Sequence, residues 1–329
     1  MTAMLSTMMN TPLGVTTLHR FGARHFVSSR VGDYDGERIH WRRYDEIDAD
    51  SARLANGLRG LGLSEGDRVG TFMWNSSRHL EAYLAVPSMG AVLHTVNCRL
   101  SPEHMAYIIN HAGDRFLIVD SRLASVLLPV LPLISKVEYL IVTGDAASLD
   151  DPRVVAYDAL VADSPADYPW PEPTENAAAG ICYTSGTTGN PKGVAYSQRT
   201  TYLHALASRA VDSFAVQERD VILMLPSMFH ANAWGFPYSG WMDVRRRYGH
   251  ARPLSSRATP ANNDRADSAN PDGNGAHTAG RFVARRRTKA SRSSVFSRNR
   301  IRWIGGAVLD DRGGARPLGR PSGSRLGND

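Results

Sequence analysis

The chain has 329 residues, of which 42% are hydrophobic and 21% charged. This composition is typical of a soluble globular protein and excludes a fibrous or wholly disordered one, and the length suggests about two domains. Two cysteines, Cys98 and Cys182, are too few for a disulfide framework or a closed zinc site and fit a reducing compartment. No stretch approaches the roughly 20 apolar residues of a membrane span, and residues 1–10 lack the features of a signal peptide. We therefore expect a cytoplasmic protein with no transmembrane segment.

The net charge of +6 is divided unevenly along the chain. Residues 1–243 carry 19 Lys and Arg against 26 Asp and Glu, a net charge of −7, whereas residues 244–329 carry 19 against 6, a net charge of +13. The second segment has 18 Arg, one Lys and no Glu, and it shows no helical or strand periodicity. We therefore expect residues 1–243 to form the folded part and residues 244–329 to be a disordered basic tail.

Short apolar segments alternate with helical segments along the first half of the chain. The first helical segment has apolar residues at helical spacing, and the second has Ser101 at its start and Gly113 after its end. The alternation predicts an α/β fold with a largely parallel sheet. In chain order, we expect a strand at 68–74, a helix at 79–86 that breaks at Pro87, a strand at 91–96, a helix at 102–111, and strands at 116–119 and 139–142.

A segment with four prolines, residues 163–176, predicts a linker or extended loop. An apolar strand at 178–183 follows this segment and leads directly into a glycine-rich loop. We expect a helix at 201–210 and a strand at 220–225 beyond the loop.

The glycine-rich loop has the groups that a triphosphate needs. Its glycines allow close approach of the backbone, successive N–H groups can form an anion-binding nest, and Lys192 supplies a positive charge. It differs from a Walker A loop, because Pro191 precedes Lys192 and Gly193 follows it. A polar hairpin turn is the alternative, since the same residue types are common in turns. The full loop is Thr184, Ser185, Gly186, Thr187, Thr188, Gly189, Asn190, Pro191, Lys192 and Gly193.

This loop resembles the signature loop of the acyl-adenylate-forming (AMP-dependent) synthetase and ligase superfamily, Thr-Ser-Gly-Thr-Thr-Gly-x-Pro-Lys-Gly. Residues 225–235, which read Leu-Pro-Ser-Met-Phe-His-Ala-Asn-Ala-Trp-Gly, resemble a segment of its fatty-acyl-CoA ligase branch. The resemblance covers roughly residues 9–242 and is closest to medium- and long-chain fatty-acid ligases. Further similar segments are 66–69, 74–75, 85–92 and 97–103, although the family often has Pro where Cys98 stands.

The resemblance implies the front part of a large adenylation domain, with mixed or parallel sheets and flanking helices, and a two-step reaction. A carboxylate attacks the α-phosphorus of Mg²⁺-bound ATP to give acyl-AMP and pyrophosphate, and the thiol of CoA then displaces AMP. The substrates would be ATP, a fatty acid and CoA, with Mg²⁺ as metal cofactor. Lys192 and His230 would be catalytic, and Thr184 would lie near Mg²⁺. The nucleotide-binding residues implied are Thr184, Ser185, Gly186, Thr187, Thr188, Gly189, Lys192, His230, Asn232 and Trp234.

Several of these residues have simpler interpretations. Without the motif, His230 would be a packed or capping residue, and Trp234 is as consistent with the core as with the mouth of an acyl tunnel. The two cysteines are better explained as small buried residues than as nucleophiles. We interpret His94 and His111 as structural.

Parts of the family pattern are missing from the chain. There is no Tyr-Gly-x-Thr-Glu segment, no Asp can be placed on the ribose hydroxyls, and the small C-terminal ligase domain is absent. We therefore expect this chain to be inactive and to expose apolar surface that lowers its solubility. Its oligomeric state and acyl chain length do not follow from the sequence.

The tail suggests a change of reading frame. The chain has 35 Arg and 3 Lys, which is typical of a GC-rich gene. Back-translation with a shift of one base lets residues 245–253 encode Gly-Ala-Asp-Met-Val-Met-Pro-Gly-Arg and residues 302–306 encode Gly-Gly-Ser-Ala-Val, both family-like segments. We hypothesise that the frame shifts near residues 242–244.

Two other functions compete with a ligase. The chain could be a non-catalytic ATP-binding remnant, or its basic tail could bind nucleic acid or another anion through the cluster at 285–292. The tail lacks interleaved aromatic residues for base stacking, so we expect no specific nucleic-acid partner.

Overall fold

The fold is given by a computed structural model, which describes part of the chain. The described residues are 4, 6–8, 10–35, 37–184, 190–218, 220–243, 247–250, 281–286, 299–304, 307–309 and 315–317. None of the helices within these ranges has the length and hydropathy required for a membrane span.

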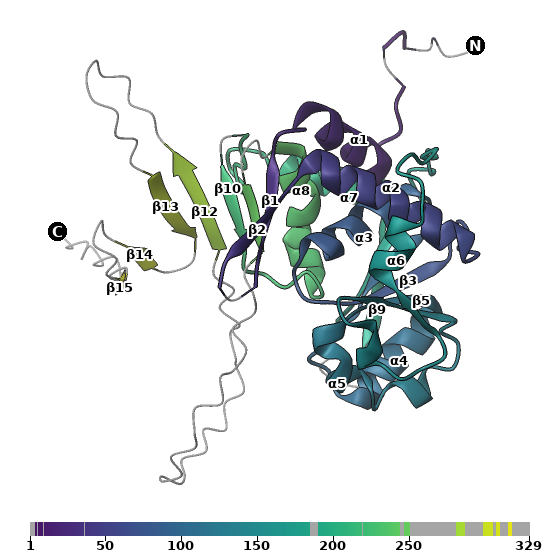
Figure 1. The fold of residues 1–329 in the computed structure, drawn as a ribbon. Helices are drawn as coiled ribbons and strands as arrows, with labels where there is room; N and C mark the ends of the chain where they lie inside the picture. Colours follow the sequence, from purple (N-terminus) through teal and green to yellow (C-terminus); the bar gives the residue numbers. More distant parts are fainter. Residues whose placement is uncertain are drawn as a thin grey trace, which may run out of the picture.

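A seven-stranded sheet with the strand order β7-β6-β5-β3-β4-β8-β9 forms the larger unit (Figure 1). All neighbouring strands are parallel except the β8–β9 pair, which is antiparallel. The predicted α/β fold with a largely parallel sheet is therefore confirmed. The strands are β3 (Arg68–Phe72), β4 (Val92–Thr95), β5 (Asp114–Asp120), β6 (Tyr139–Thr143), β7 (Val154–Ala156), β8 (Ala178–Thr184) and β9 (Lys192–Ser197).

Helices cover both faces of this sheet, which explains why its strands are continuously apolar. Along β5, Phe116 and Ile118 belong to one buried cluster, whereas Leu117 and Val119 belong to the other. The first cluster packs on α1 (Val15–His25), α2 (Tyr44–Gly60), α3 (Ser77–Ser88), α6 (Tyr157–Ala162) and α8 (Phe236–Asp243), and the second packs on α4 (Pro102–Ala112) and α5 (Ala124–Leu127).

The predicted break at Pro87 is wrong. Helix α3 includes Pro87 and ends one residue later, at Ser88. Proline at this position removes one backbone N–H near the end of the helix, where little of the helix remains to be disrupted. The last carbonyls have other partners, because Gln198 Nε2 donates to the Pro87 oxygen at 2.9 Å and Thr16 Oγ1 donates to the Ser88 oxygen at 3.1 Å.

Two other helices show how capping residues set the boundaries. Helix α4 begins after Ser101, whose side chain accepts from the His104 amide, and ends at Gly113 in the left-handed conformation, as predicted. Helix α7 (Gln198–Ala207) begins and ends earlier than the predicted 201–210, because Ser197 caps it by accepting from the Thr200 amide.

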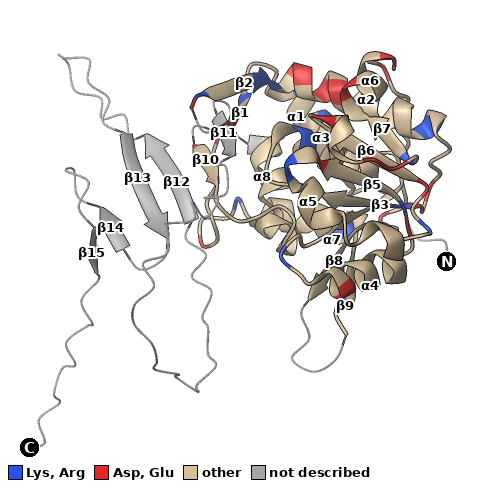
Figure 2. Ribbon diagram, turned by 60° about the horizontal axis from the view of Figure 1, so that its bottom comes forward, with Lys and Arg blue, Asp and Glu red and all other residues tan. Residues whose placement is uncertain are grey.

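A buried ion network joins α3 to α6 and to Arg42 of β2 (Ile39–Arg43). The carboxylate of Glu81 has no exposed surface and accepts from Arg42, Arg78 and the hydroxyl of Tyr157. Burial raises the pKa of Glu81. Figure 2 shows acidic and basic positions interspersed over the described elements.

A second sheet has the order β13-β12-β10-β11-β1-β2. We expected residues 244–329 to lack regular structure, but the structure describes five short strands there, and the rest of that segment lies outside the described residues. The first of these strands, β11, forms because it pairs in parallel with both β10 and β1. The remaining strands are β1 (Arg30–Tyr34), β2 (Ile39–Arg43), β10 (Val221–Met224), β11 (Arg247–His250), β12 (Arg281–Arg286), β13 (Asn299–Ile304), β14 (Ala307–Leu309) and β15 (Ala315–Pro317).

Candidate functional site

The glycine-rich loop joins the two strands of the β8–β9 hairpin. Thr184 is the last residue of β8 and Lys192 is the first of β9, and the two are paired across the hairpin. Both residues are exposed, so a hydroxyl and an ammonium group lie together at the neck of the loop. Their contacts with phosphate remain predictions. The other residues predicted to bind the nucleotide here, Ser185, Gly186, Thr187, Thr188 and Gly189, lie outside the described residues.

The second motif forms a left-handed turn. Ala231, Asn232, Ala233 and Trp234 have φ angles of 46°, 49°, 46° and 58°, and Gly235 continues the turn at 73°. A left-handed conformation costs about 1–2 kcal/mol for each residue that carries a side chain. Such a run persists only where the surrounding structure determines it. The turn is therefore held by contacts from the rest of the molecule.

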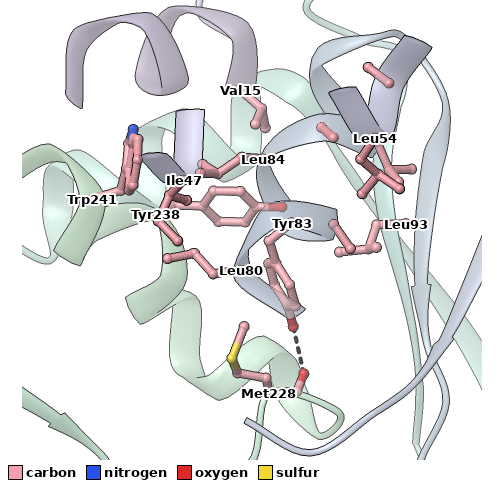
Figure 3. Packing of buried hydrophobic residues seen from close by; sticks show 14 of the residues in the cluster. Val15, Ile47, Leu54, Leu80, Tyr83, Leu84, Leu93, Met228, Tyr238 and Trp241 are labelled. Atoms are coloured by element: carbon pink, nitrogen blue, oxygen red, sulfur yellow. Dashed lines mark hydrogen bonds between the residues drawn. The ribbon is translucent and has the colours of Figure 1, made fainter. Parts of the chain in front are cut away.

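Asn232 provides these contacts at the centre of the turn. Its Oδ1 atom accepts from the thiol of Cys182 at 3.0 Å and lies 3.2 Å from the hydroxyl of Tyr83 and 3.3 Å from that of Thr95. The Tyr83 hydroxyl also donates to the backbone oxygen of Met228 at 2.5 Å, the contact that is dashed in Figure 3. Strands β4 and β8 and helix α3 thus fix the turn from three sides.

The contact between Cys182 and Asn232 joins the two sequence motifs. Cys182 precedes Thr184 by two residues on β8, so the left-handed turn lies beside the strand that leads into the loop. Burial raises the pKa of the Cys182 thiol and keeps it protonated as a hydrogen-bond donor. We interpreted Cys182 as a small buried residue; it is buried, and it is also a structural hydrogen-bond donor.

His230 and Trp234 flank this turn on the surface. The side chain of Trp234 is 39% exposed, so it is not a core residue, and His230 is also exposed. The apolar contacts at this point come from Phe229 instead, which is buried against Trp74 with ring centroids 5.6 Å apart. Both side chains are accessible to solvent, and their proposed roles at the nucleotide remain predictions.

Cys98 does not belong to the site chemistry. It is buried, and burial raises the pKa of its thiol to about 12. The thiolate, which is the nucleophilic form, is therefore scarce at neutral pH. This agrees with the interpretation of Cys98 as a buried structural residue.

The donor set at the neck fits an anion better than a metal ion alone. Within the described residues no group of three or more His, Cys, Asp or Glu side chains could hold a metal. Magnesium is commonly held through one or two protein oxygens together with phosphate oxygens and water. The Thr184 hydroxyl is compatible with that arrangement, and its role as a Mg²⁺ ligand remains a prediction.

Sequence reasoning missed the residues that anchor the turn. Tyr83 lies on the apolar side of α3, and its spacing indicated only core packing. Thr95 ends a strand whose four residues are all buried. Neither residue lies in a motif, and only the packing of α3 and β4 against the turn reveals their function.

The fold is shared with solved acyl-CoA-forming enzymes. An anthranilate CoA ligase in complex with anthranoyl-AMP matches 73% of this chain and 45% of its own length, with a TM-score of 0.63 and 18% identity. A Mycobacterium tuberculosis fatty acyl CoA synthetase matches 73% of this chain with a TM-score of 0.59 and 22% identity. At these identities the comparison establishes the fold alone.

Sequence comparison identifies the family. Residues 19–243 match the family model of AMP-binding enzymes, and the chain belongs to this family. The long-chain-fatty-acid–CoA ligase of Thermus thermophilus is 43% identical over 243 residues, and the medium-chain-fatty-acid–CoA ligase of Ectopseudomonas oleovorans is 39% identical over 246 residues. Each match covers 73% of this chain and 43% or 44% of the relative. The chain thus spans less than half the length of the curated relatives it matches.

Proposed function

We propose that the chain is the front part of an enzyme that activates a medium- or long-chain fatty acid with ATP and transfers the acyl group to CoA. The observation that carries this proposal is the hydrogen bond between Cys182 and Asn232, which brings the two motifs together beside Thr184 and Lys192. The Thermus and Ectopseudomonas relatives, named as long- and medium-chain fatty-acid ligases, support the substrate class. The family and the cysteine content support a cytoplasmic location.

The residues at the neck would act mainly by neutralising charge. Attack of a carboxylate on a triphosphate brings anions together, so fixed positive charge lowers the barrier. The ammonium of Lys192 would face the phosphates, Thr184 would donate to them and help to hold Mg²⁺, and Mg²⁺ when bound would supply further positive charge. His230, Asn232 and Trp234 would line the side where the nucleotide and the acyl group meet.

We further propose that residues 1–243 form a partial adenylation domain, that the reading frame shifts near residues 242–244, and that this chain does not complete the reaction. The match to the family model of AMP-binding enzymes ends at residue 243, which supports the proposed boundary. A remnant that binds ATP without turnover is the alternative function to be separated from a ligase.

ATP–pyrophosphate exchange with fatty acids of 4 to 18 carbons, together with calorimetric titration of Mg-ATP, tests these proposals. We expect Mg-ATP binding that the substitution Lys192→Ala weakens at least tenfold, and no exchange. Exchange that depends on Lys192 would refute inactivity and show a working adenylation site. Absence of ATP binding, with salt-dependent binding of polyanions instead, would refute the ligase assignment and favour the basic-tail alternative.

A further inference from the structure

A cluster of polar groups lies beneath the neck of the glycine-rich loop. It consists of one tyrosine and the three ionisable side chains around it, which we call the tyrosine cradle: Tyr183, His94, Asp114 and His111. Our interpretation of His94 and His111 from the sequence gave them no role beyond structure, and the reaction proposed above uses none of the four.

The base of the cradle is a fully buried pair. His94 on β4 and Asp114 on β5 have no exposed side-chain surface, and His94 Nδ1 lies 2.7 Å from Asp114 Oδ2. Strand β3 runs between them, and the pair meets there because Gly70 has no side chain. A Cβ atom at Gly70 would lie 2.9 Å from the Asp114 carboxylate and 2.6 Å from Leu117. The sheet therefore leaves room for this contact.

Tyr183 lies above this pair on β8. Its ring centroid is 5.1 Å from that of His94, and its hydroxyl oxygen is 2.6 Å from His111 Nδ1. On the β9 side, a Cβ atom at Gly193 would lie 3.0 Å from the tyrosine ring. Tyr183 is therefore half-buried beside α4, β4 and β9, and it is the residue immediately before Thr184.

The buried pair of His94 and Asp114 is unfavourable for the free energy of folding if its only role is to support Tyr183. A buried ion pair is often no more stable than apolar residues of the same size. In the described part of the chain, His94 Nε2 and Asp114 Oδ1 have no hydrogen-bond partner, which adds to the cost. Burial raises the pKa of Asp114, opposed by His94 and by Arg68.

The other groups that face Tyr183 keep its hydroxyl protonated. Burial and the nearby groups Asp114 and Tyr107 raise the pKa of Tyr183 to about 12. The phenol therefore keeps its proton at neutral pH and can donate it to a neutral His111. Tyr107 stacks on His111 with ring centroids 5.3 Å apart, which limits the movement of the imidazole.

We propose that the tyrosine cradle positions the neck of the glycine-rich loop, by fixing Tyr183 and through it the pairing of Thr184 with Lys192. The cradle residues touch no substrate and act through the hairpin. The identity of the ligand in this inference rests on the proposed function. The effect of the cradle on the pairing of Thr184 with Lys192 does not, because it concerns the hairpin alone.

The substitution Tyr183→Phe tests the link because it removes only the hydroxyl. One neutral hydrogen bond changes a local opening equilibrium by about 2- to 12-fold. We expect amide hydrogen exchange of residues 192–194 to accelerate by this factor, and the Kd of Mg-ATP to rise by at most this factor. Exchange of β5 should stay unchanged, and the thermal midpoint should fall by no more than about 6 °C. Tyr107→Phe is the matched control, since it makes the same chemical change on the other side of His111.

A second pair of variants keeps the test decisive if Tyr183→Phe disturbs folding. His111→Asn retains an acceptor near the position of Nδ1 and should keep exchange normal, whereas His111→Ala should behave like Tyr183→Phe. Unchanged exchange in Tyr183→Phe and His111→Ala, equal effects in the Tyr107→Phe control, or faster exchange throughout the sheet would each overturn the inference. If the unmodified chain binds no Mg-ATP, the proposed function fails, and hydrogen exchange alone decides the role of the cradle.

Discussion

The strand β11 offers a direct test of the proposed change of reading frame. It lies between β10 and β1 and is parallel to both, and positions 248 and 250 pair with Ile222 and Met224 of β10. Both β10 residues are almost completely buried. Residues paired in register share a face of the sheet, so positions 248 and 250 are in register with two buried residues of β10. The chain has Tyr-Gly-His at 248–250, whereas the shifted frame encodes Met-Val-Met.

The double substitution Gly249→Val and His250→Met installs the apolar residues of the shifted frame. Full burial of a methionine side chain contributes about 1.5–3 kcal/mol, and removal of a glycine from a strand contributes about 0.5–1 kcal/mol. The sum is roughly 2–4 kcal/mol, an upper estimate because unfolded chains already bury some apolar surface. For a domain of this size, 1 kcal/mol corresponds to about 2–4 °C in the thermal midpoint. We therefore expect an increase of roughly 4–16 °C.

Differential scanning calorimetry of the unmodified chain and the double variant measures this shift. His104→Met is the matched control, because His104 is exposed on α4 and the same exchange should change the midpoint by less than about 2 °C. An unchanged or lowered midpoint in the double variant would refute the reasoning, since positions 249 and 250 of β11 would then not favour the residues of the shifted frame. Resequencing of the gene across codons 241–248 independently decides whether a base has been gained or lost.

Three further predictions concern stability. Replacing Glu81 by Ala breaks the buried pair with Arg42, which keeps Asp50 as its other carboxylate partner, and urea unfolding should show a loss of about 3 kcal/mol, the low end for a broken buried pair; a loss below 1 kcal/mol would contradict the buried network. Ala231→Gly should raise stability by about 0.5–1 kcal/mol, because glycine relieves the left-handed strain but loses more entropy on folding, and a decrease would argue against that turn. Because the pKa of Cys98 is raised to about 12 when folded, unfolding releases a proton above the ordinary thiol pKa, so stability should fall as the pH rises from about 9 towards 12; Cys98→Ala should flatten this part of the pH profile of the melting temperature.

The sequence was sufficient where one local signal determined the structure. The continuous apolar run at 116–119 predicted β5, and Ser101 with Gly113 predicted both ends of α4. The elements between residues 15 and 60 were not predicted. Strands β1 and β2 contain three Arg residues and one Asp and show no clean alternation. They pair with each other as a hairpin, and the partner on the other side of β1 is β11, more than 200 residues away. Non-local pairing of this kind leaves no periodic pattern to detect.

The same distinction between local and non-local determinants explains which parts of the site could be predicted. The loop at 184–193 is recognisable because its residue types follow from the needs of a phosphate. The left-handed turn at 231–235 is not, because Ala and Trp oppose that conformation and only Asn232, held by Tyr83 and Cys182, stabilises it. A motif can therefore indicate that a segment matters without indicating its backbone conformation. Substitution of Tyr83 should disturb Asn232 as much as a change within the motif does. The reason is that contacts from α3 and β8, rather than contacts within the turn, offset its strain.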